Sequence, residues 1–293
     1  MNARSALAAG ITLLFWSSAF AGIRYGLSAF SPLELALLRF STASAAMLIY
    51  ALATRMRLPD RKDLPAITLT ALSGVTIYHI TLNIGEQTVT AGAASLLIST
   101  APVFIVLLAA IFLHERMTRL TVAGMVISVI GAAMISFGKN GALEFNAGAL
   151  LILVSAVSGA IYSLGQKRLL PKYGAAALTT YCVWIGTIFF LPAAPGLIRA
   201  IQQTTWQPVA TVVYLGIFPT AVAYVTWAYV LKVFPAARAA SILYLVPVLA
   251  IVIAWIWINE IPAWISLLGG VFAVAGVILV NWKPRGPVVP AEG

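Results

Sequence analysis

The segment from residue 92 to 113 reads GAASLLISTAPVFIVLLAAIFL and contains no charged side chain. About 20 apolar residues in an α-helix cross the hydrocarbon core of a bilayer, so this segment predicts a transmembrane helix. A second segment, AASILYLVPVLAIVIAWIWINE at residues 239 to 260, shares the Ala-Ala-Ser triplet and an internal proline. Each half of the chain therefore contains a related membrane-spanning segment.

The whole chain has the composition of a membrane protein. Of its 293 residues, 61% are hydrophobic and only 9% are charged, and the mean hydropathy is +0.99. A soluble domain carries about 25% charged residues, so this chain lacks the side chains for a water-facing surface. The single cysteine, Cys182, excludes a disulfide framework and a cysteine-rich metal site.

Apolar runs separated by charged residues, proline or glycine fill the chain. At roughly 25 to 30 residues for a span and its connection, the length accommodates about ten spans and no separate soluble domain. We expect spans at residues 5–23, 33–54, 64–82, 92–113, 120–138, 147–166, 174–192, 208–230, 236–258 and 263–282.

The formal net charge of +10 fits a membrane topology better than nucleic-acid binding. The basic residues lie singly or in small groups between apolar runs, so we expect no nucleic-acid partner. With ten spans both termini share one side, and most basic residues gather there: Arg4, Arg55, Arg57, Arg61, Lys62, Arg116, Arg119, Lys167, Arg168, Lys172, Lys232, Lys283 and Arg285. The other side has Arg24, Lys139 and Arg199. The positive-inside rule therefore predicts a multi-pass protein of a bacterial-type inner (plasma) membrane with cytoplasmic termini.

The two halves of the chain share one plan. Pro247 follows Pro102 by 145 residues. The same offset relates Glu115 to Glu260, Gly124 to Gly269, Ser128 to Ala273 and Gly131 to Gly276. Since each repeat holds five spans, an odd number, the second repeat enters the membrane from the opposite side. We therefore predict an all-α integral membrane protein of ten transmembrane helices in two inverted five-helix repeats.

These repeats divide the chain into residues 1–138 and 147–282, followed by a disordered cytoplasmic tail at 283–293. The first span resembles a signal peptide, with Arg4 before it and Ala19-Phe20-Ala21 near its end. It also has a counterpart in the second repeat, so we expect it to be retained. Inverted repeats are the architecture of many secondary transporters, which bind substrate near the midplane and work by alternating access.

The sequence also resembles the EamA-type drug/metabolite transporter superfamily over nearly its whole length, about residues 5 to 282. The motifs that carry the resemblance are Trp16-Ser17-Ser18-Ala19-Phe20, Pro32 to Arg39, the run before Pro102, His114-Glu115-Arg116, Ala240-Ser241-Ile242-Leu243, Asn259-Glu260 and Gly269-Gly270. The resemblance implies ten helices in two inverted repeats and transport of small metabolites, often outward. The aromatic residues on polar-bearing spans are similar to those of the aromatic amino-acid exporter branch.

Polar side chains within the spans indicate a central pathway, because polar groups are costly in lipid and turn toward the bundle interior or water. His79, Asn83 and Glu86 follow helical spacing on one face. Similar residues on other spans complete a predicted substrate site of Tyr78, His79, Asn83, Ser95, Ser99, Tyr162, Gln166, Tyr224, Trp227, Ser241 and Tyr244. The amide, hydroxyl and imidazole groups suit a zwitterion, and the aromatic rings suit its side chain.

Plainer interpretations compete with this one. A single intramembrane histidine such as His79 is often a packing residue, and Glu86, at the end of its span, equally fits solvation. Arg39 lies five positions after Glu34, out of phase for a pair on one helix face. We expect Arg39 to meet another helix or to snorkel.

Two further patterns concern movement and packing. Pro102 and Pro247 fall mid-helix in the predicted spans, where each removes a backbone hydrogen bond and bends the helix. Their recurrence at equivalent positions favours hinges over packing features. The small residues that begin at Gly124 and Gly269 allow close backbone approach, either inside the bundle or at a dimer face. Monomer and homodimer therefore both fit.

Few residues suit an enzyme. His114-Glu115-Arg116 lacks the second histidine of a zinc-binding helix, and no glycine-rich phosphate loop is present. We expect no enzyme activity, no cofactor and no metal. The sequence favours a secondary carrier that exports aromatic or other neutral amino acids and related metabolites, with a small-molecule substrate and membrane lipid as partners. The alternatives are a carrier of nucleotide or sugar derivatives or drugs, and a non-transporting membrane receptor.

Overall fold

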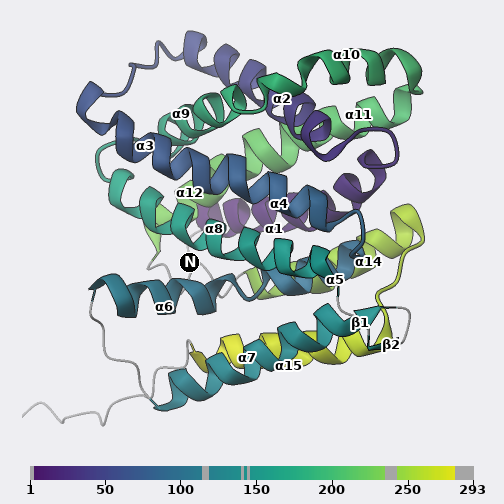
Figure 1. Ribbon diagram of the computed structural model, residues 1–293. Helices are drawn as coiled ribbons and strands as arrows, with labels where there is room; N and C mark the ends of the chain where they lie inside the picture. The colour runs from purple at the N-terminus through teal and green to yellow at the C-terminus, as the bar shows by residue number, and fades with distance from the viewer. Residues whose placement is uncertain (1–2, 114–118, 140–141, 144–145, 235–242, 281–293) are drawn as a thin grey trace, which may run out of the picture.

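The computed structural model describes residues 3–113, 119–139, 142–143, 146–234 and 243–280. Within these ranges the chain folds into helices, with one exception (Figure 1). The strands β1 (Gly138–Lys139) and β2 (Ala142–Leu143) pair antiparallel, with Gly138 opposite Leu143. The predicted tail at 283–293 and the predicted start of the ninth span at 236 lie outside the described residues.

The described residues of the first half form seven helices and two short irregular segments. The helices are α1 (Ala3–Gly26), α2 (Pro32–Ala53), α3 (Leu64–Ala71), α4 (Tyr78–Gly85), α5 (Ala91–Ile98), α6 (Ala101–Leu113) and α7 (Arg119–Phe137). A 3-10 turn, η1 (Arg61–Asp63), precedes α3, and a π-helical segment, η2 (Leu72–Ile77), joins α3 to α4.

The second half follows the same plan. Its helices are α8 (Ala147–Leu169), α9 (Ala175–Ile188), α10 (Ala194–Gln203), α11 (Trp206–Leu215), α12 (Ala223–Val233), α14 (Val246–Ile258) and α15 (Trp264–Val280). The irregular segments are η3 (Leu191–Ala193), the π-helical η4 (Gly216–Val222) and the 3-10 turn η5 (Leu243–Leu245).

Local sequence signals fix where several helices begin. Ser31 caps α2 and exchanges hydrogen bonds with Glu34, while Pro32 occupies the first turn. Asn146 caps α8 by accepting a hydrogen bond from the Gly148 amide at 2.9 Å. These caps satisfy amide groups that the helix cannot pair internally, which matters more in lipid than in water.

The described helices include an apolar run at each of the ten predicted spans. Five helical runs are long and apolar enough to cross a bilayer: Ala3–Gly26, Pro32–Ala53, Arg61–Gly85, Ala147–Leu169 and Trp206–Val233. A sixth is formed by α9 with the following Leu191–Gln203, bent by 49°. Four shorter apolar helices correspond to the four remaining predicted spans: Ala91–Ile105, Val122–Ile135, Val246–Ile258 and Trp264–Leu279. The prediction of a ten-helix, two-repeat membrane fold is confirmed.

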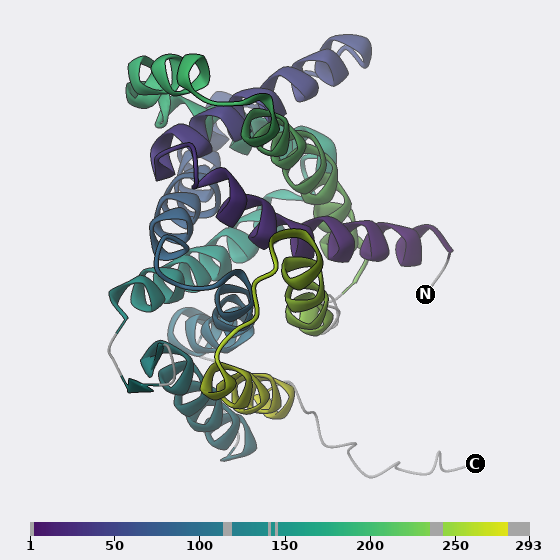
Figure 2. The same ribbon diagram turned by 90° about the vertical axis from the view of Figure 1, so that its right-hand side faces the viewer.

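The small residues of α7 and α15 pack against each other within the chain. Both views show the two helices side by side at one edge of the bundle (Figures 1 and 2). A Cβ atom on Gly131 would lie 2.3 Å from the Ala273 amide nitrogen, and one on Gly276 would lie 2.4 Å from the Ser128 amide nitrogen. Of the two uses left open for these residues, the structure shows packing inside the bundle.

The mid-helix position expected for the two prolines is wrong. The fourth span breaks at Ser99 and Thr100, and Pro102 is the second residue of the helix that follows. Pro247 likewise lies in the first turn of α14. A proline in the first turn removes no intrahelical hydrogen bond, because the amide there has no helical partner. The hinge role of Pro102 and Pro247 stays a prediction, and Pro102 follows directly on the helix break at Ser99 and Thr100.

The two π-helical segments occupy equivalent places in the two repeats. Segment η2 leads directly into α4, and η4 leads directly into α12. Such segments widen the helix by one residue per turn and occur often at functional sites. At η4 the backbone approaches α2 closely, since a Cβ atom on Gly216 would lie 2.5 Å from the Arg39 carbonyl oxygen. The segments therefore set the orientation of the side chains that follow.

Candidate functional site

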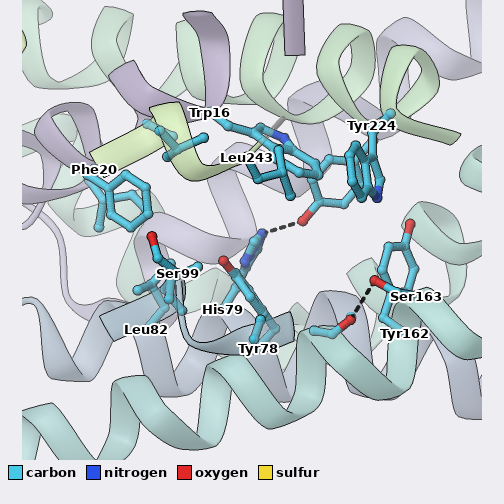
Figure 3. Close-up of a pocket in the computed structure, with 18 of the residues that line it drawn as sticks. Trp16, Phe20, Tyr78, His79, Leu82, Ser99, Tyr162, Ser163, Tyr224 and Leu243 are labelled. Atoms are coloured by element: carbon cyan, nitrogen blue, oxygen red, sulfur yellow. Dashed lines mark hydrogen bonds between the residues drawn. The ribbon is translucent and has the colours of Figure 1, made fainter. Parts of the chain in front are cut away.

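A cavity of about 140 Å³ lies between the two repeats. Cavities of about 150 Å³ accommodate a benzene ring, so the space suits one aromatic side chain. Aromatic residues from both repeats form its walls: Trp16, Phe20, Tyr78, Tyr162, Tyr224 and Trp227. Polar groups reach it at Arg39, His79, Ser99 and Ser163. Figure 3 shows Trp16 and Tyr224 on one side of this space and Tyr78 and Tyr162 on the other.

A hydrogen bond joins the two repeats at the cavity. The Tyr224 hydroxyl lies 3.0 Å from His79 Nε2, and both side chains are buried (Figure 3). The His79 ring also packs on Phe40, with ring centroids 4.6 Å apart. Its Nδ1 has no hydrogen-bond partner among the described residues. His79 is therefore held by packing and one hydrogen bond while one polar atom stays unsatisfied.

Aromatic contacts hold Tyr224 from two sides. The Trp16 ring meets Tyr224 edge to face with centroids 5.7 Å apart, and the Tyr162 ring lies 6.1 Å away. Trp16 is fixed in turn because its indole nitrogen donates to the Pro219 carbonyl in η4 at 3.1 Å. Aromatic pairs at these separations contribute about 0.5 to 1.5 kcal/mol beyond their buried area. The walls of the cavity are thus preorganised by contacts across the repeat boundary.

Two glycines seat the tyrosines of the opposite wall. A Cβ atom on Gly74 would lie 2.1 Å from the Tyr162 ring, and one on Gly159 would lie 3.2 Å from the Tyr78 ring. The Gly74 contact leaves no room for any side chain, whereas the Gly159 contact is tight but involves the mobile edge of a ring. Each tyrosine therefore rests on the backbone of the neighbouring helix.

Hydrogen bonds within helices use some donors and acceptors at the cavity and leave others available to a ligand. The hydroxyls of Ser99 and Ser163 donate to the carbonyls of Ser95 and Gly159 at 2.8 and 2.9 Å. They can still accept a hydrogen bond from a ligand. Gln166 Nε2 donates to the Tyr162 hydroxyl at 2.8 Å, so the tyrosine keeps its own proton for another acceptor.

The structure brings together some predicted site residues and separates others. Those that line the cavity are Tyr78, His79, Ser99, Tyr162, Tyr224 and Trp227, together with Pro102. Asn83 does not, and its amide instead donates to the Pro32 carbonyl at 3.0 Å. Ser95 donates to the Gly92 carbonyl, and Gln166 donates to the Tyr162 hydroxyl. Ser241 and the Tyr244 side chain lie outside the described residues, and Pro247 is buried away from the cavity.

Charged residues link the repeats at one end of the bundle. Arg24 Nε lies 3.3 Å from Glu260 Oε1, and the arginine also donates to the backbone carbonyl of Gln87 at 2.9 Å. Glu260 Oε2 accepts a hydrogen bond from the Ala91 amide at 3.2 Å. Glu86 beside them is fully buried, so the solvated alternative for its side chain is wrong.

Sequence reasoning missed Trp16 and Arg39 as cavity residues. Arg39 meets another helix, one of its two expected environments, because its Nε donates to Thr220 Oγ1 in η4 at 2.7 Å. The available signal was an arginine inside an apolar span, since such residues mark functional positions. For Trp16, an aromatic residue in an apolar helix carries no comparable signal.

Comparison with known proteins identifies a family and a solved structure that are similar to this chain. The model of the EamA-like transporter family matches residues 3–137 and again residues 146–282. A solved crystal structure with 22% sequence identity superposes with a TM-score of 0.65, covering 95% of this chain and 96% of that chain. At that identity the likeness shows the fold alone.

Curated relatives are similar over most of their length. The uncharacterized transporter YdfC of Bacillus subtilis is 44% identical over 268 residues, covering 92% of this chain and 88% of the relative. A Streptantibioticus cattleyicolor protein named "Probable terminal-alkyne amino-acid exporter" is 38% identical, covering 94% and 93%. A Salmonella typhimurium protein named "Probable amino-acid metabolite efflux pump" is 25% identical, covering 73% and 77%.

Proposed function

Because the chain belongs to the EamA-like transporter family and is a multi-pass membrane transporter, we propose that it exports an aromatic or other neutral amino acid, or a related small metabolite. The observation that carries the proposal is the cavity at the boundary of the repeats, with aromatic walls and a size that suits one ring. Small-molecule sites are mostly apolar and have a few placed polar groups, as this cavity has.

Alternating access is the mechanism that this architecture supports. The repeats meet at the cavity through the bond between His79 and Tyr224, and at one end of the bundle through Arg24 and Glu260. Rocking of one repeat against the other breaks contacts at one end and forms them at the other, while the central site stays in place. A carrier of this kind needs positioned groups and no catalytic residues.

Two relatives support amino acids or their derivatives as the substrate class. Their names describe a terminal-alkyne amino-acid exporter and an amino-acid metabolite efflux pump. The aromatic specificity rests on Trp16, Tyr162, Tyr224 and Trp227 around the cavity. The proposed outward direction of transport rests on the family resemblance and on the names of these two relatives. The cytoplasmic position of both termini rests on the distribution of basic residues.

Counter-flow in proteoliposomes tests the proposal. Vesicles with the purified protein are loaded with unlabelled compound, and uptake of the labelled compound is followed for aromatic amino acids, aliphatic amino acids, a sugar phosphate and a nucleoside. We expect uptake of aromatic amino acids above that of empty vesicles, and a loss in Trp227→Ala. Uptake of the sugar phosphate or nucleoside alone would favour another metabolite class. Binding without counter-flow would favour a receptor.

A matched pair of variants separates the cavity from its surroundings. Tyr224 and Tyr229 lie on the same helix, α12, but only Tyr224 lines the cavity. Tyr224→Phe should reduce counter-flow, while Tyr229→Phe should leave it near the parental rate. Equal effects of the two substitutions would contradict a substrate role of the cavity.

A further inference from the structure

Arg39 is a buried cation that forms no ion pair with a carboxylate among the described residues. Arg39 is only 3% exposed and lies on α2. The ion pairs among the described residues join Arg24 to Glu260 and Lys172 to Asp60 and Asp63. Arg39 takes part in none of them.

Its neighbours compensate the charge only in part. Arg39 Nε donates to Thr220 Oγ1 at 2.7 Å, and Thr220 itself donates to the Leu215 carbonyl at 2.9 Å. The Phe40 ring lies 5.7 Å from the guanidinium carbon. Glu86 interacts with Arg39 only at longer range, and neither carboxylate oxygen of Glu86 has a hydrogen-bond partner among the described residues.

Arg39 borders the cavity and has donors left for a ligand. Arg39 lines it, while its two terminal nitrogens make no hydrogen bond with any residue in the described ranges. A buried ion without an opposite charge is costly, and inside a membrane such residues persist where they serve a ligand or a pathway. The missing opposite charge therefore points to a bound anion.

We propose that Arg39 binds the carboxylate group of the substrate, an inference that rests on the proposed carrier function and names its substrate class. A guanidinium offers two parallel donors that match the two oxygens of a carboxylate. Thr220 holds Nε and so orients the plane of the group, which leaves the terminal nitrogens for the ligand. The hydroxyls of Tyr78 and Tyr162 border the same space and add donors.

The same cavity lacks a partner for an ammonium group. None of its described lining residues is an aspartate or a glutamate, and Arg39 is the charged residue among them. A positive group on the ligand gains no ion pair there and is repelled by the guanidinium. The carboxylate is thus the required feature, and the α-ammonium is dispensable. The substrate class is an aromatic carboxylate, with or without an amino group.

Titration calorimetry with four probes tests this assignment on the full-length protein in detergent. The probes share a phenyl ring: phenylalanine and 3-phenylpropionate carry a carboxylate, whereas phenylalaninamide and phenethylamine carry an amino group and no carboxylate. We expect the two carboxylates to bind at least about tenfold more tightly than the amide and the amine. Arg39→Gln should remove this preference, and Arg39→Lys should restore part of it. Arg199→Gln, which removes an exposed arginine of α10, should retain it.

The ratio between probes is measured within each variant, so partial loss of folded protein does not change it. Equal binding of the two carboxylates, the amide and the amine by the parental protein would overturn the role of Arg39. An intact preference in Arg39→Gln would do the same, and in both cases counter-flow of aromatic amino acids would leave the carrier function standing. Binding of none of the four probes would overturn the aromatic substrate class as well.

Discussion

The Tyr224 hydroxyl bonds to His79 Nε2 at 3.0 Å, and these two residues are equivalents in the two repeats, 145 positions apart. Two residues related by a pseudo-twofold axis can touch each other only if they lie close to that axis. Ser44 and Thr187, 143 positions apart, form a second contact between the repeats, with hydroxyl oxygens 2.9 Å from each other. The cavity therefore lies at the axis, where residues of both repeats form its walls.

Truncation of His79 should reduce transport more than stability. His79→Ala removes the bond to Tyr224 but enlarges an existing cavity that water can fill, so the structure loses little. We expect counter-flow to fall by at least about tenfold, equivalent to about 1.4 kcal/mol, with a change in melting temperature of only a few degrees. Counter-flow per folded molecule and thermal unfolding in detergent check this together. Normal transport with a large loss of stability would make His79 a packing residue.

The two glycines beneath the tyrosines should differ in tolerance. Gly74→Ala places a methyl group where the Tyr162 ring lies, at 2.1 Å, so the ring must leave its position. Gly159→Ala places one 3.2 Å from the edge of the Tyr78 ring, which can tilt away. We expect Gly74→Ala to lower substrate affinity at least about tenfold and Gly159→Ala to lower it about threefold or less. The reverse order in a binding titration would contradict the arrangement of this wall.

The contact between α7 and α15 should make its glycines essential for stability. A methyl group at Gly131 or Gly276 would collide with backbone atoms of the opposite helix. Overpacking of this kind costs about 1 to 3 kcal/mol, so Gly131→Ala and Gly276→Ala should lower the unfolding temperature in detergent. Gly10→Ala is the matched control, since nothing lies within 4 Å of the added atom. If all three variants unfold alike, the close packing of the two helices is wrong.

The ion pair between Arg24 and Glu260 should keep one end of the bundle closed. Glu260→Gln removes the charge that Arg24 meets at 3.3 Å and weakens the acceptor of the Ala91 amide. We expect a cysteine at Ser99 in the cavity to react faster with a membrane-impermeant maleimide added from outside. Arg24→Gln should have the same effect, because either change breaks the same pair. Unchanged labelling in both variants would mean that this contact does not control access.

The proposed orientation predicts labelling from opposite faces of the membrane. Lys167 and Arg199 are both exposed, and the charge distribution places Lys167 in the cytoplasm and Arg199 outside. A cysteine at Lys167 should react only in inverted vesicles, and one at Arg199 only in intact cells. The native Cys182 is fully buried and gives a low background. Labelling of both positions from one face would contradict the proposed orientation.

The sequence alone determined the spans, the inverted repeat and the family. Each of these follows from properties that a linear sequence carries directly. Apolar length decides whether a helix spans the membrane, and a constant offset such as that from Pro102 to Pro247 reveals the duplication. The odd number of spans in each repeat then fixes the inversion without any knowledge of packing.

Only the tertiary structure decided which side chains reach the cavity. Asn83 and Ser95 share helix faces with cavity residues, yet both donate to backbone carbonyls instead. The π-helical segments η2 and η4 change the number of residues per turn, so the faces of α4 and α12 cannot be projected from α3 and α11. Arg39 reaches the cavity because η4 of the other repeat packs against α2 and supplies Thr220. Contacts between distant segments depend on the packed bundle, and a single sequence does not carry them.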